Sequence, residues 1–192
     1  MTDVPFLEGK DIYLRPLTES DCDGPYLTWF NDPETCRGNS HHLFPYTREA
    51  AIEYIRQANT AKDKLVLAII SSKNNKHIGN IALDGINYIN RTAELSIIIG
   101  DKSFWNKGYG KQAARLICDH GFLALNLNRI ACGTFENNTA MQKLAEYLGM
   151  VKEGVRRKAA CKSGVYLDVI EYGVLRSEYL GRFNLEKTGN KG

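Results

Sequence analysis

The chain has 192 residues, of which 43% are apolar and 24% are charged, and its formal net charge is +3. This length and composition are those of one ordinary globular domain with enough residues for a full hydrophobic core. The small, scattered basic excess argues against a dedicated nucleic-acid surface, so no nucleic-acid partner is expected. A local basic pocket for one polyanionic ligand is still compatible with these numbers.

The chain has five cysteines, at positions 22, 36, 118, 132 and 161. Their odd number and the lack of CxxC spacing predict neither a disulfide framework nor a metal site, and they indicate a reducing compartment. The N-terminal MTDVPFLEGKD lacks the basic region and apolar core of a signal peptide. No apolar run reaches the roughly 18 residues of a membrane helix. These features predict a cytoplasmic protein without a membrane partner.

Hydrophobic periodicity and turn residues divide the chain into short elements, without a linker or an internal repeat. The capping-box spacing of Thr18 and Asp21 marks one helix start, Thr47 marks another, and Gly149 marks a helix end. The predicted elements, in chain order, are a strand over 11–17, a helix over 18–32, a loop over 34–46, a helix over 48–59, strands over 65–71, 77–83 and 93–100, a helix from the glycine segment to about 125, a strand over 129–135, a helix over 139–149, and strands over 150–160 and 166–175.

The order of these elements limits the topology. Three consecutive strands with short links, over residues 65–100, must be antiparallel neighbours, whereas the strand–helix–strand unit around 93–135 is expected to be parallel. We therefore predict an α+β fold with a mixed, mostly antiparallel sheet and helices on both faces. One domain is expected over residues 1–192, with a core over about 11–180 and a frayed tail over 186–192.

The segment SFWNKGYGKQAARL, residues 103–116, places glycines and lysines at the start of a predicted helix. Backbone N–H groups from Asn106 to Lys111 would point toward an anion there, where the helix dipole is positive. Gly108 and Gly110 remove the Cβ atoms that would keep a pyrophosphate away. The cations that surround the segment are Lys102, Lys107, Lys111 and Arg115. These features predict a phosphate-binding site.

Two other interpretations fit the same glycines. Residues 108–113 match the G-x-G-x-x-A form of a dinucleotide fingerprint, and Glu136 ends the next strand where a ribose-binding carboxylate could stand. Against an NAD-binding oxidoreductase, residues 101–107 separate the strand from the glycines, and the upstream strands are expected to be antiparallel. The other alternative is a helix N-terminus whose glycines serve only tight packing.

The stretch FWNKGYGKQA resembles the acetyl-CoA loop of the GNAT superfamily of N-acetyltransferases, usually written Q/R-x-x-G-x-G/A. Trp105 stands where Gln or Arg is commonest, as in the subgroup that resembles ribosomal-protein N-terminal acetyltransferases. A companion pattern follows: Asn138, a helix, LGM at 148–150 and EG at 153–154. The resemblance runs from YLRPL at 13 to the EYGVL strand, and it implies a GNAT fold whose sheet is splayed at the acetyl-CoA strand.

The resemblance implies an acyltransferase that uses acetyl-CoA as co-substrate and acetylates a primary amine of a small molecule by direct attack. The strand before the loop would pair its backbone with the pantetheine arm and polarise the thioester carbonyl. Asn138 would hydrogen-bond the cofactor, with an N-cap as its alternative role, and Lys143 would reach a phosphate unless it is simply solvated. The implied cofactor-binding residues are Ser96, Ile97, Ile98, Ile99, Trp105, Asn106, Lys107, Gly108, Tyr109, Gly110, Lys111, Asn138 and Lys143.

Only a neutral amine attacks a thioester, so the site needs a base, and the leaving thiolate must regain a proton. Glu94 is the first candidate base because alternation places it with Ser96 beside the splayed strand; its alternative is a solvent-facing carboxylate paired with Arg91. Glu136 is the second candidate. Many family members take the acid from a Tyr four residues before the motif glycine, where this chain has Ala145. A catalytically silent CoA-binding protein is therefore a further alternative.

Two stretches indicate the class of acceptor. YLTWFNDPE and INYINRTAE are both similar to stretches of enzymes that acetylate nucleotide-linked amino sugars. The second stretch also resembles polyamine acetyltransferases. Because residues 26–58 show no acidic cluster, we expect an amino-sugar acceptor before a polyamine or a ribosomal-type protein N-terminus. The strand over 166–175 could also pair across a homodimer.

The expected acceptor-binding residues are Trp29, His41, His42, Asp84 and Asp168. Each has a plainer alternative: the helical spacing of Trp29 fits a core residue, the two loop histidines could be solvated, and the two aspartates could start turns or lie at a strand edge.

Overall fold

The computed structural model describes residues 4–185, so the expected frayed tail over 186–192 lies outside the described residues. The strands are β1 (Leu7–Glu8), β2 (Ile12–Pro16), β3 (Leu65–Ser71), β4 (Lys76–Asn87), β5 (Thr92–Ile99), β6 (Arg129–Phe135), β7 (Val151–Lys162) and β8 (Val165–Leu175). The helices are α1 (Tyr26–Phe30), α2 (Arg48–Thr60), α3 (Tyr109–Leu123), α4 (Thr139–Leu148) and α5 (Arg176–Arg182), and the 3-10 turns are η1 (Glu19–Asp23) and η2 (Lys102–Phe104).

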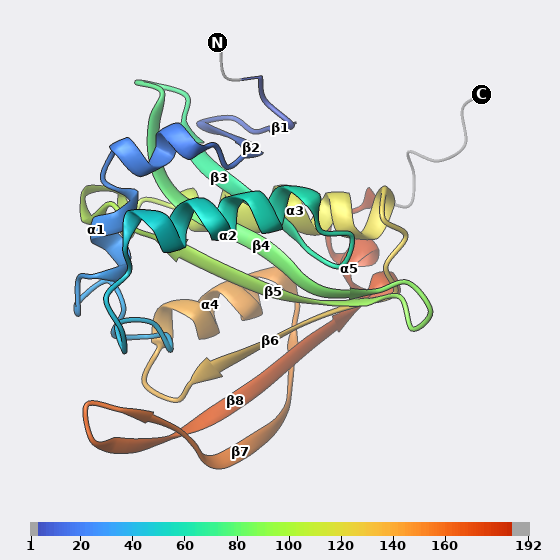
Figure 1. Ribbon diagram of the computed structural model, residues 1–192. Coiled ribbons are helices and arrows are strands. Elements are labelled where there is room, and N and C mark those ends of the chain that lie inside the picture. The colour runs from blue at the N-terminus through green and yellow to red at the C-terminus, as the bar shows by residue number, and fades with distance from the viewer. Residues whose placement is uncertain (1–3, 186–192) are drawn as a thin grey trace.

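The strands form one sheet in the spatial order β1-β2-β3-β4-β5-β6-β8-β7. All neighbours pair antiparallel except β5 and β6, which are parallel and joined by the α3 crossover. This confirms the predicted mixed, mostly antiparallel sheet. The β5–β6 ladder covers only Thr92–Glu94 and Arg129–Ala131. Beyond these residues the two strands diverge, so the sheet opens into a V between them (Figure 1). The predicted splay is therefore present.

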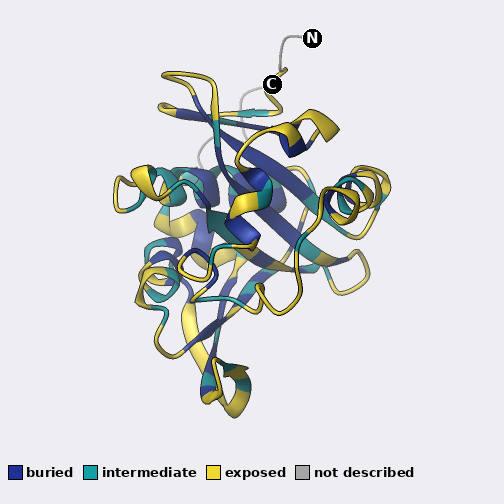
Figure 2. Ribbon diagram, turned by 60° about the vertical axis from the view of Figure 1, so that its left-hand side comes forward, coloured by how far each residue is buried: buried dark blue, intermediate teal, exposed yellow. Residues whose placement is uncertain are grey.

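Helices cover both faces of the sheet. α3, α4 and α5 pack on one face around a cluster that includes Phe122, Leu144 and Tyr179. α1 and α2 pack on the other face around a cluster that includes Tyr26 and Ile55. The buried residues gather along the strands between these layers, while the outer faces of the helices are exposed (Figure 2). None of the described helices is long and apolar enough to cross a membrane.

The predicted helix over residues 18–32 is interrupted. The capping box forms, since the Thr18 backbone N–H donates to the Asp21 carboxylate at 2.8 Å, but it starts only the short turn η1. Gly24 then adopts an extended backbone, and Pro25 precedes the separate helix α1. Proline lacks the N–H that a continuous helix would need and its ring clashes with the preceding turn, so the helix breaks there.

The hairpin of β7 and β8 corrects another expectation. β8 pairs with β6 on one side and β7 on the other, so its backbone has no open edge for pairing across a homodimer. The predicted turn CKSG is shorter than expected: Ser163 and Gly164 alone connect the strands, with φ angles of 52° and 78°. Two successive left-handed residues are typical of the tight turn that matches strand twist. β1 and α5 have no counterpart among the predicted elements.

Candidate active site

The open V leaves one edge of β5 exposed. Ile97, Ile98 and Ile99 pair with β4 on one side, but in the part of the chain that the structure describes no strand pairs with their other edge. Unpaired backbone N–H and C=O groups in such an edge bind an extended partner as an added strand would. This geometry fits the predicted pairing of residues 96–99 with a pantetheine arm, which stays a prediction.

The glycine segment forms a turn that leads from β5 to α3. Asn106 and Gly108 adopt left-handed conformations with φ angles of 58° and 84°, and Gly108 is the N-cap of α3. A Cβ atom placed on Gly108 would meet nothing within 4 Å, so the space in front of the helix N-terminus is open. The Trp105 indole N–H donates to the Ile99 carbonyl at 2.7 Å and fastens this turn to the end of β5. The arrangement suits a pyrophosphate.

The predicted ring of cations is smaller than expected. Lys102 forms ion pairs with carboxylates at 2.6 and 2.5 Å in the loop after α1, and Arg115 pairs with Asp119 within its own helix. Lys111 lies 5.0 Å from the centre of the Tyr147 ring, beside the start of α3. Lys143 is exposed on α4, one turn before Tyr147. Lys107 and Lys111 thus stay near the helix start, and the Arg37 guanidinium, 5.6 Å from the centre of the Trp105 ring, adds a cation that the sequence did not suggest.

Asn138 has two polar partners. Its side-chain oxygen accepts from the Met141 backbone N–H at 3.2 Å, so the N-cap interpretation is confirmed. Its amide nitrogen donates to the Gly38 carbonyl at 3.0 Å, which lies in the loop between α1 and α2. The cofactor-binding role of Asn138 stays a prediction.

Thr134 on β6 is a candidate that sequence reasoning missed. It is 4% exposed, and its hydroxyl has no hydrogen-bond partner among the described residues. Because Glu94 pairs with Ala131, a continued register would place Thr134 opposite Ile97 across the V. A buried hydroxyl without a partner needs an explanation. The open edge of β5 and the space at Gly108 fit a ligand that carries both amide groups and a pyrophosphate, as CoA does.

Two carboxylates face each other where the V begins. Asp84 on β4 and Glu94 on β5 are direct cross-strand partners, and the Ser96 hydroxyl donates to Asp84 at 2.9 Å. Neither carboxylate forms an ion pair within the described residues 4–185. The alternative pairing of Glu94 with Arg91 is wrong, since that guanidinium donates to Asn126 at 2.7 and 2.8 Å.

Glu136 and Asp168 lie in a different place. Glu136 is five residues beyond Ala131, the partner of Glu94, which corresponds to about 17 Å along the strand. Its carboxylate accepts from the Asp168 backbone N–H at 3.0 Å, and the Asp168 carboxylate accepts from that of Lys158 at 2.9 Å. Both line an open pocket of about 630 Å³ with Arg157 and Lys158. The two candidate bases are therefore not brought together.

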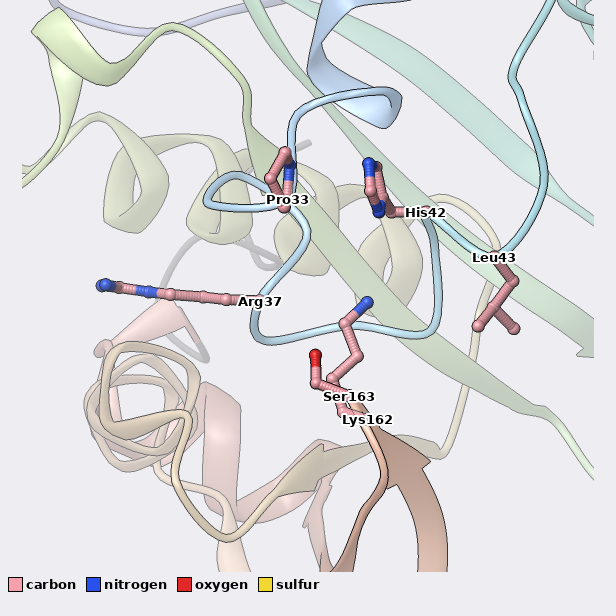
Figure 3. A pocket seen from close by; sticks show the side chains of 6 residues that line it. All are labelled: Pro33, Arg37, His42, Leu43, Lys162 and Ser163. Atoms are coloured by element: carbon pink, nitrogen blue, oxygen red, sulfur yellow. The ribbon is translucent and has the colours of Figure 1, made fainter.

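The three aromatic or histidine candidates for acceptor binding also lie in different surroundings. Trp29 is 3% exposed, and a Cβ on Gly100 would clash with its ring, so it packs in the core and lines no open surface. The His41 ring packs edge-on against Phe30, and partial burial together with the charge of Lys162 lowers the pKa of His41. His42 lines a pocket of about 330 Å³ (Figure 3). The residues around that pocket are Pro33, Arg37, His42, Leu43, Lys162 and Ser163.

Position 145, where many family members have the proton-donating Tyr, has no acidic side chain here. Ala145 lies on α4 and is fully buried, and its methyl group has no proton to give to a thiolate. Tyr147, two residues along, stacks under Lys111 and meets the Phe183 ring edge-on. Among the described residues there is also no group of His, Cys, Asp and Glu side chains that could hold a metal ion.

Comparisons with known proteins agree with this geometry. Residues 11–151 match the acetyltransferase (GNAT) domain. The N-acetyltransferase p20 of Bacillus licheniformis is 29% identical over 177 residues, which cover 91% of this chain and 98% of that protein. The spermidine N(1)-acetyltransferase of Escherichia coli K12 is 30% identical over 176 residues, or 90% of each chain. The crystal structure of the Vibrio cholerae spermidine N-acetyltransferase with CoA and spermine has a TM-score of 0.80 at 25% identity, covering 90% and 99% of the two chains.

These matches remove two alternatives. A dinucleotide-binding unit would need parallel strands on both sides of β5, but only β6 is parallel and β4 is antiparallel, so the oxidoreductase interpretation is wrong. The matched N-acetyltransferases also support an active acyltransferase and not a catalytically silent CoA-binding protein. The chain therefore belongs to the GNAT acetyltransferase family and is an N-acetyltransferase with acetyl-CoA as its co-substrate.

Proposed function

We propose that the acceptor presents a primary ammonium group to Asp84 and Glu94. The observation that carries this proposal is the direct cross-strand pairing of two carboxylates without a cation. Like charges directly opposite in a sheet are destabilising, and a bound ammonium group would remove that repulsion. The pair lies where the V begins, on the face that α1 and α2 cover, while β5 continues from Glu94 into the open edge.

The two carboxylates have different surroundings, which suggests different roles. Asp84 accepts the Ser96 hydroxyl and is held in place, so it would bind and orient the ammonium group. Glu94 is exposed and makes no such bond to any residue between 4 and 185, so it would take the proton of the ammonium group directly or through a water. Burial, followed by the charge of Asp84, raises the pKa of Tyr54 to about 12, which keeps this neighbouring phenol protonated. Acetyl-CoA supplies the activated acetyl group as a thioester.

The loop after α1 favours an acceptor that also carries negative charge. Its carboxylates Asp32 and Glu34 are paired with Lys102, and that ammonium lowers the pKa of Asp32 to about 2. The charged side chains that line the adjoining pocket are instead those of Arg37 and Lys162. A polyamine would be repelled by them, whereas a diphosphate would be attracted. We therefore infer that the acceptor is a nucleotide-linked amino sugar.

A polyamine is the second candidate, because opposed carboxylates would bind any ammonium group. The similar enzymes of Escherichia coli and Vibrio cholerae are named spermidine acetyltransferases. A protein N-terminus, the ribosomal-type alternative, can be tested in the same experiment as a peptide.

The test is thiol release from acetyl-CoA with nucleotide-linked amino sugars, spermidine and an N-terminal peptide. We expect turnover of an amino sugar, and a loss in kcat of about 100-fold in Glu94→Gln with an unchanged dissociation constant for acetyl-CoA. Glu136→Gln, which alters the competing candidate base, is expected to keep its activity. Turnover of spermidine alone would overturn the acceptor class, and full activity of Glu94→Gln would remove Glu94 as the base.

A further inference from the structure

A short segment of the loop after α1, residues 37–42, spans the open end of the V. The Arg37 guanidinium lies 5.6 Å from the centre of the Trp105 ring, on the glycine turn that follows β5. The Gly38 carbonyl accepts from Asn138 at the start of α4, which follows β6. The same segment thus contacts both arms of the V. Figure 1 shows this loop and the β7–β8 hairpin on the side where the V opens.

Lys162 makes the contact between this segment and the hairpin. Its ammonium group donates to the Asn39 carbonyl at 3.1 Å and to the His41 carbonyl at 2.6 Å. Lys162 is the last residue of β7, and the tight turn of Ser163 and Gly164 that follows fixes its position. Charge-assisted hydrogen bonds to two carbonyls are stronger than neutral ones. The segment is therefore held by a side chain more than a hundred residues away.

The partners of Lys162 leave its charge uncompensated. Carbonyl oxygens carry only partial charge, and no acidic side chain pairs with Lys162 within residues 4–185. The ammonium group also lines the pocket of about 330 Å³ on the side of His42, whereas the Arg37 side chain extends away from it (Figure 3). One group thus fixes the backbone of the segment and contributes positive charge to the pocket beside it.

We propose that Lys162 is a positioning residue for the acceptor. It fastens residues 37–42 across the open end of the V, so that this segment forms a wall of the acceptor site and presents positive charge to the anionic part of the acceptor. The choice of an anionic acceptor rests on the proposed function, but the fastening of the segment does not.

Gly38 provides an independent way to disturb the same fastening. A Cβ atom there would lie 2.7 Å from the amide nitrogen of Asn138, so an alanine would push the segment away from α4 without changing any charge. Lys162→Met removes the ammonium group but keeps most of the apolar stem, and Lys162→Arg keeps both charge and donors. Lys152→Met, an exposed lysine on the same strand, is the matched control.

The experiment measures acceptor KM and kcat by thiol release, the acetyl-CoA dissociation constant by calorimetry, and proteolysis within residues 37–46. We expect Lys162→Met to raise acceptor KM about tenfold and to speed cleavage, with acetyl-CoA affinity changed less than about twofold. Lys162→Arg is expected to restore KM to within about threefold of the wild type. Gly38→Ala, whose methyl group also presses on Asn138, is expected to speed cleavage as well, and Lys152→Met to match the wild type.

An unchanged acceptor KM in Lys162→Met, or an equal loss of acetyl-CoA affinity, would overturn the proposal, because the lysine would then be irrelevant or merely structural. If spermidine proves to be the acceptor, the proposed acceptor class fails separately. The fastening role is still supported in that case if Lys162→Met and Gly38→Ala both speed cleavage and Lys162→Met changes only the acceptor KM.

Discussion

The two sides of the V are built from different parts of the chain. The side that fits acetyl-CoA consists mainly of backbone from one continuous stretch: the open edge of β5, the left-handed turn at Asn106 and Gly108, and the start of α3. The side that we propose for the acceptor consists of side chains from distant segments, with Asp84 and Glu94 on the sheet and Lys162 on a hairpin. Backbone groups are common to all residues, so the first side suits an invariant co-substrate. The second side can change its specificity through a few substitutions.

Gly108→Val is expected to have the largest effect on the cofactor side. The branched side chain would fill the open space in front of α3, and we expect acetyl-CoA binding to weaken about 100-fold or more. Valine at a φ of 84° also strains the backbone, so Gly85→Val provides a matched control. Gly85 has a φ of 58° and equally open surroundings. Calorimetry should show a similar loss of thermal stability in both variants, but a loss of acetyl-CoA affinity only at Gly108.

Thr134→Val tests whether side chains also contribute to the cofactor side. Valine has nearly the same shape and removes a buried hydroxyl that has no partner among the described residues. We expect the free energy of unfolding to stay level or to rise by up to about 1 kcal/mol. If the hydroxyl binds the co-substrate, the dissociation constant of acetyl-CoA should rise about fivefold. A less stable variant with unchanged acetyl-CoA affinity would show that Thr134 is only a packing residue.

Lys102→Met should have the smallest effect, and on the acceptor side alone. Its ion pairs with Asp32 and Glu34 are exposed, so their loss should raise acceptor KM only about two- to fourfold, and less at high salt. Because the pKa of Asp32 is lowered, the ion pair of Asp32 with Lys102 stabilises the loop fully at pH values above the ordinary pKa of aspartate. This stabilisation is lost as the pH falls through about 2. Protection of the loop from an acid-stable protease should therefore fall below pH 4 in the wild type, and much less in the variant.

The contrast between a side built from one continuous stretch and a side built from distant segments also explains which features could be predicted from the sequence. The strands over 65–71 and 129–135, the Thr47 cap and the Gly149 helix end depend on neighbours within a few residues, and all are present. The splay followed from a family resemblance that two local motifs carry, the glycine segment and the pattern that begins at Asn138. Such features can be predicted because the pattern and the structure that it specifies lie in the same stretch of chain.

The acceptor side could not be predicted in the same way. The pairing of Lys102 with Asp32 and of Lys162 with carbonyls after Gly38 joins segments about 70 and 120 residues apart. Sequence spacing also gave no reason to separate Glu136 from Glu94, because the distance depends on the register of β5 and β6. The break before α1 is a local feature, and it shows that Gly24 and Pro25 outweigh the capping box at Thr18.

The division between the two sides is tested most directly by one variant, Asp84→Asn combined with Glu94→Gln. Its acetyl-CoA dissociation constant is measured by calorimetry, and its kcat/KM for the acceptor by thiol release. We expect an affinity for acetyl-CoA within about twofold of the wild type and a kcat/KM at least about 100-fold lower. A large loss of acetyl-CoA affinity, or turnover close to that of the wild type, would contradict it.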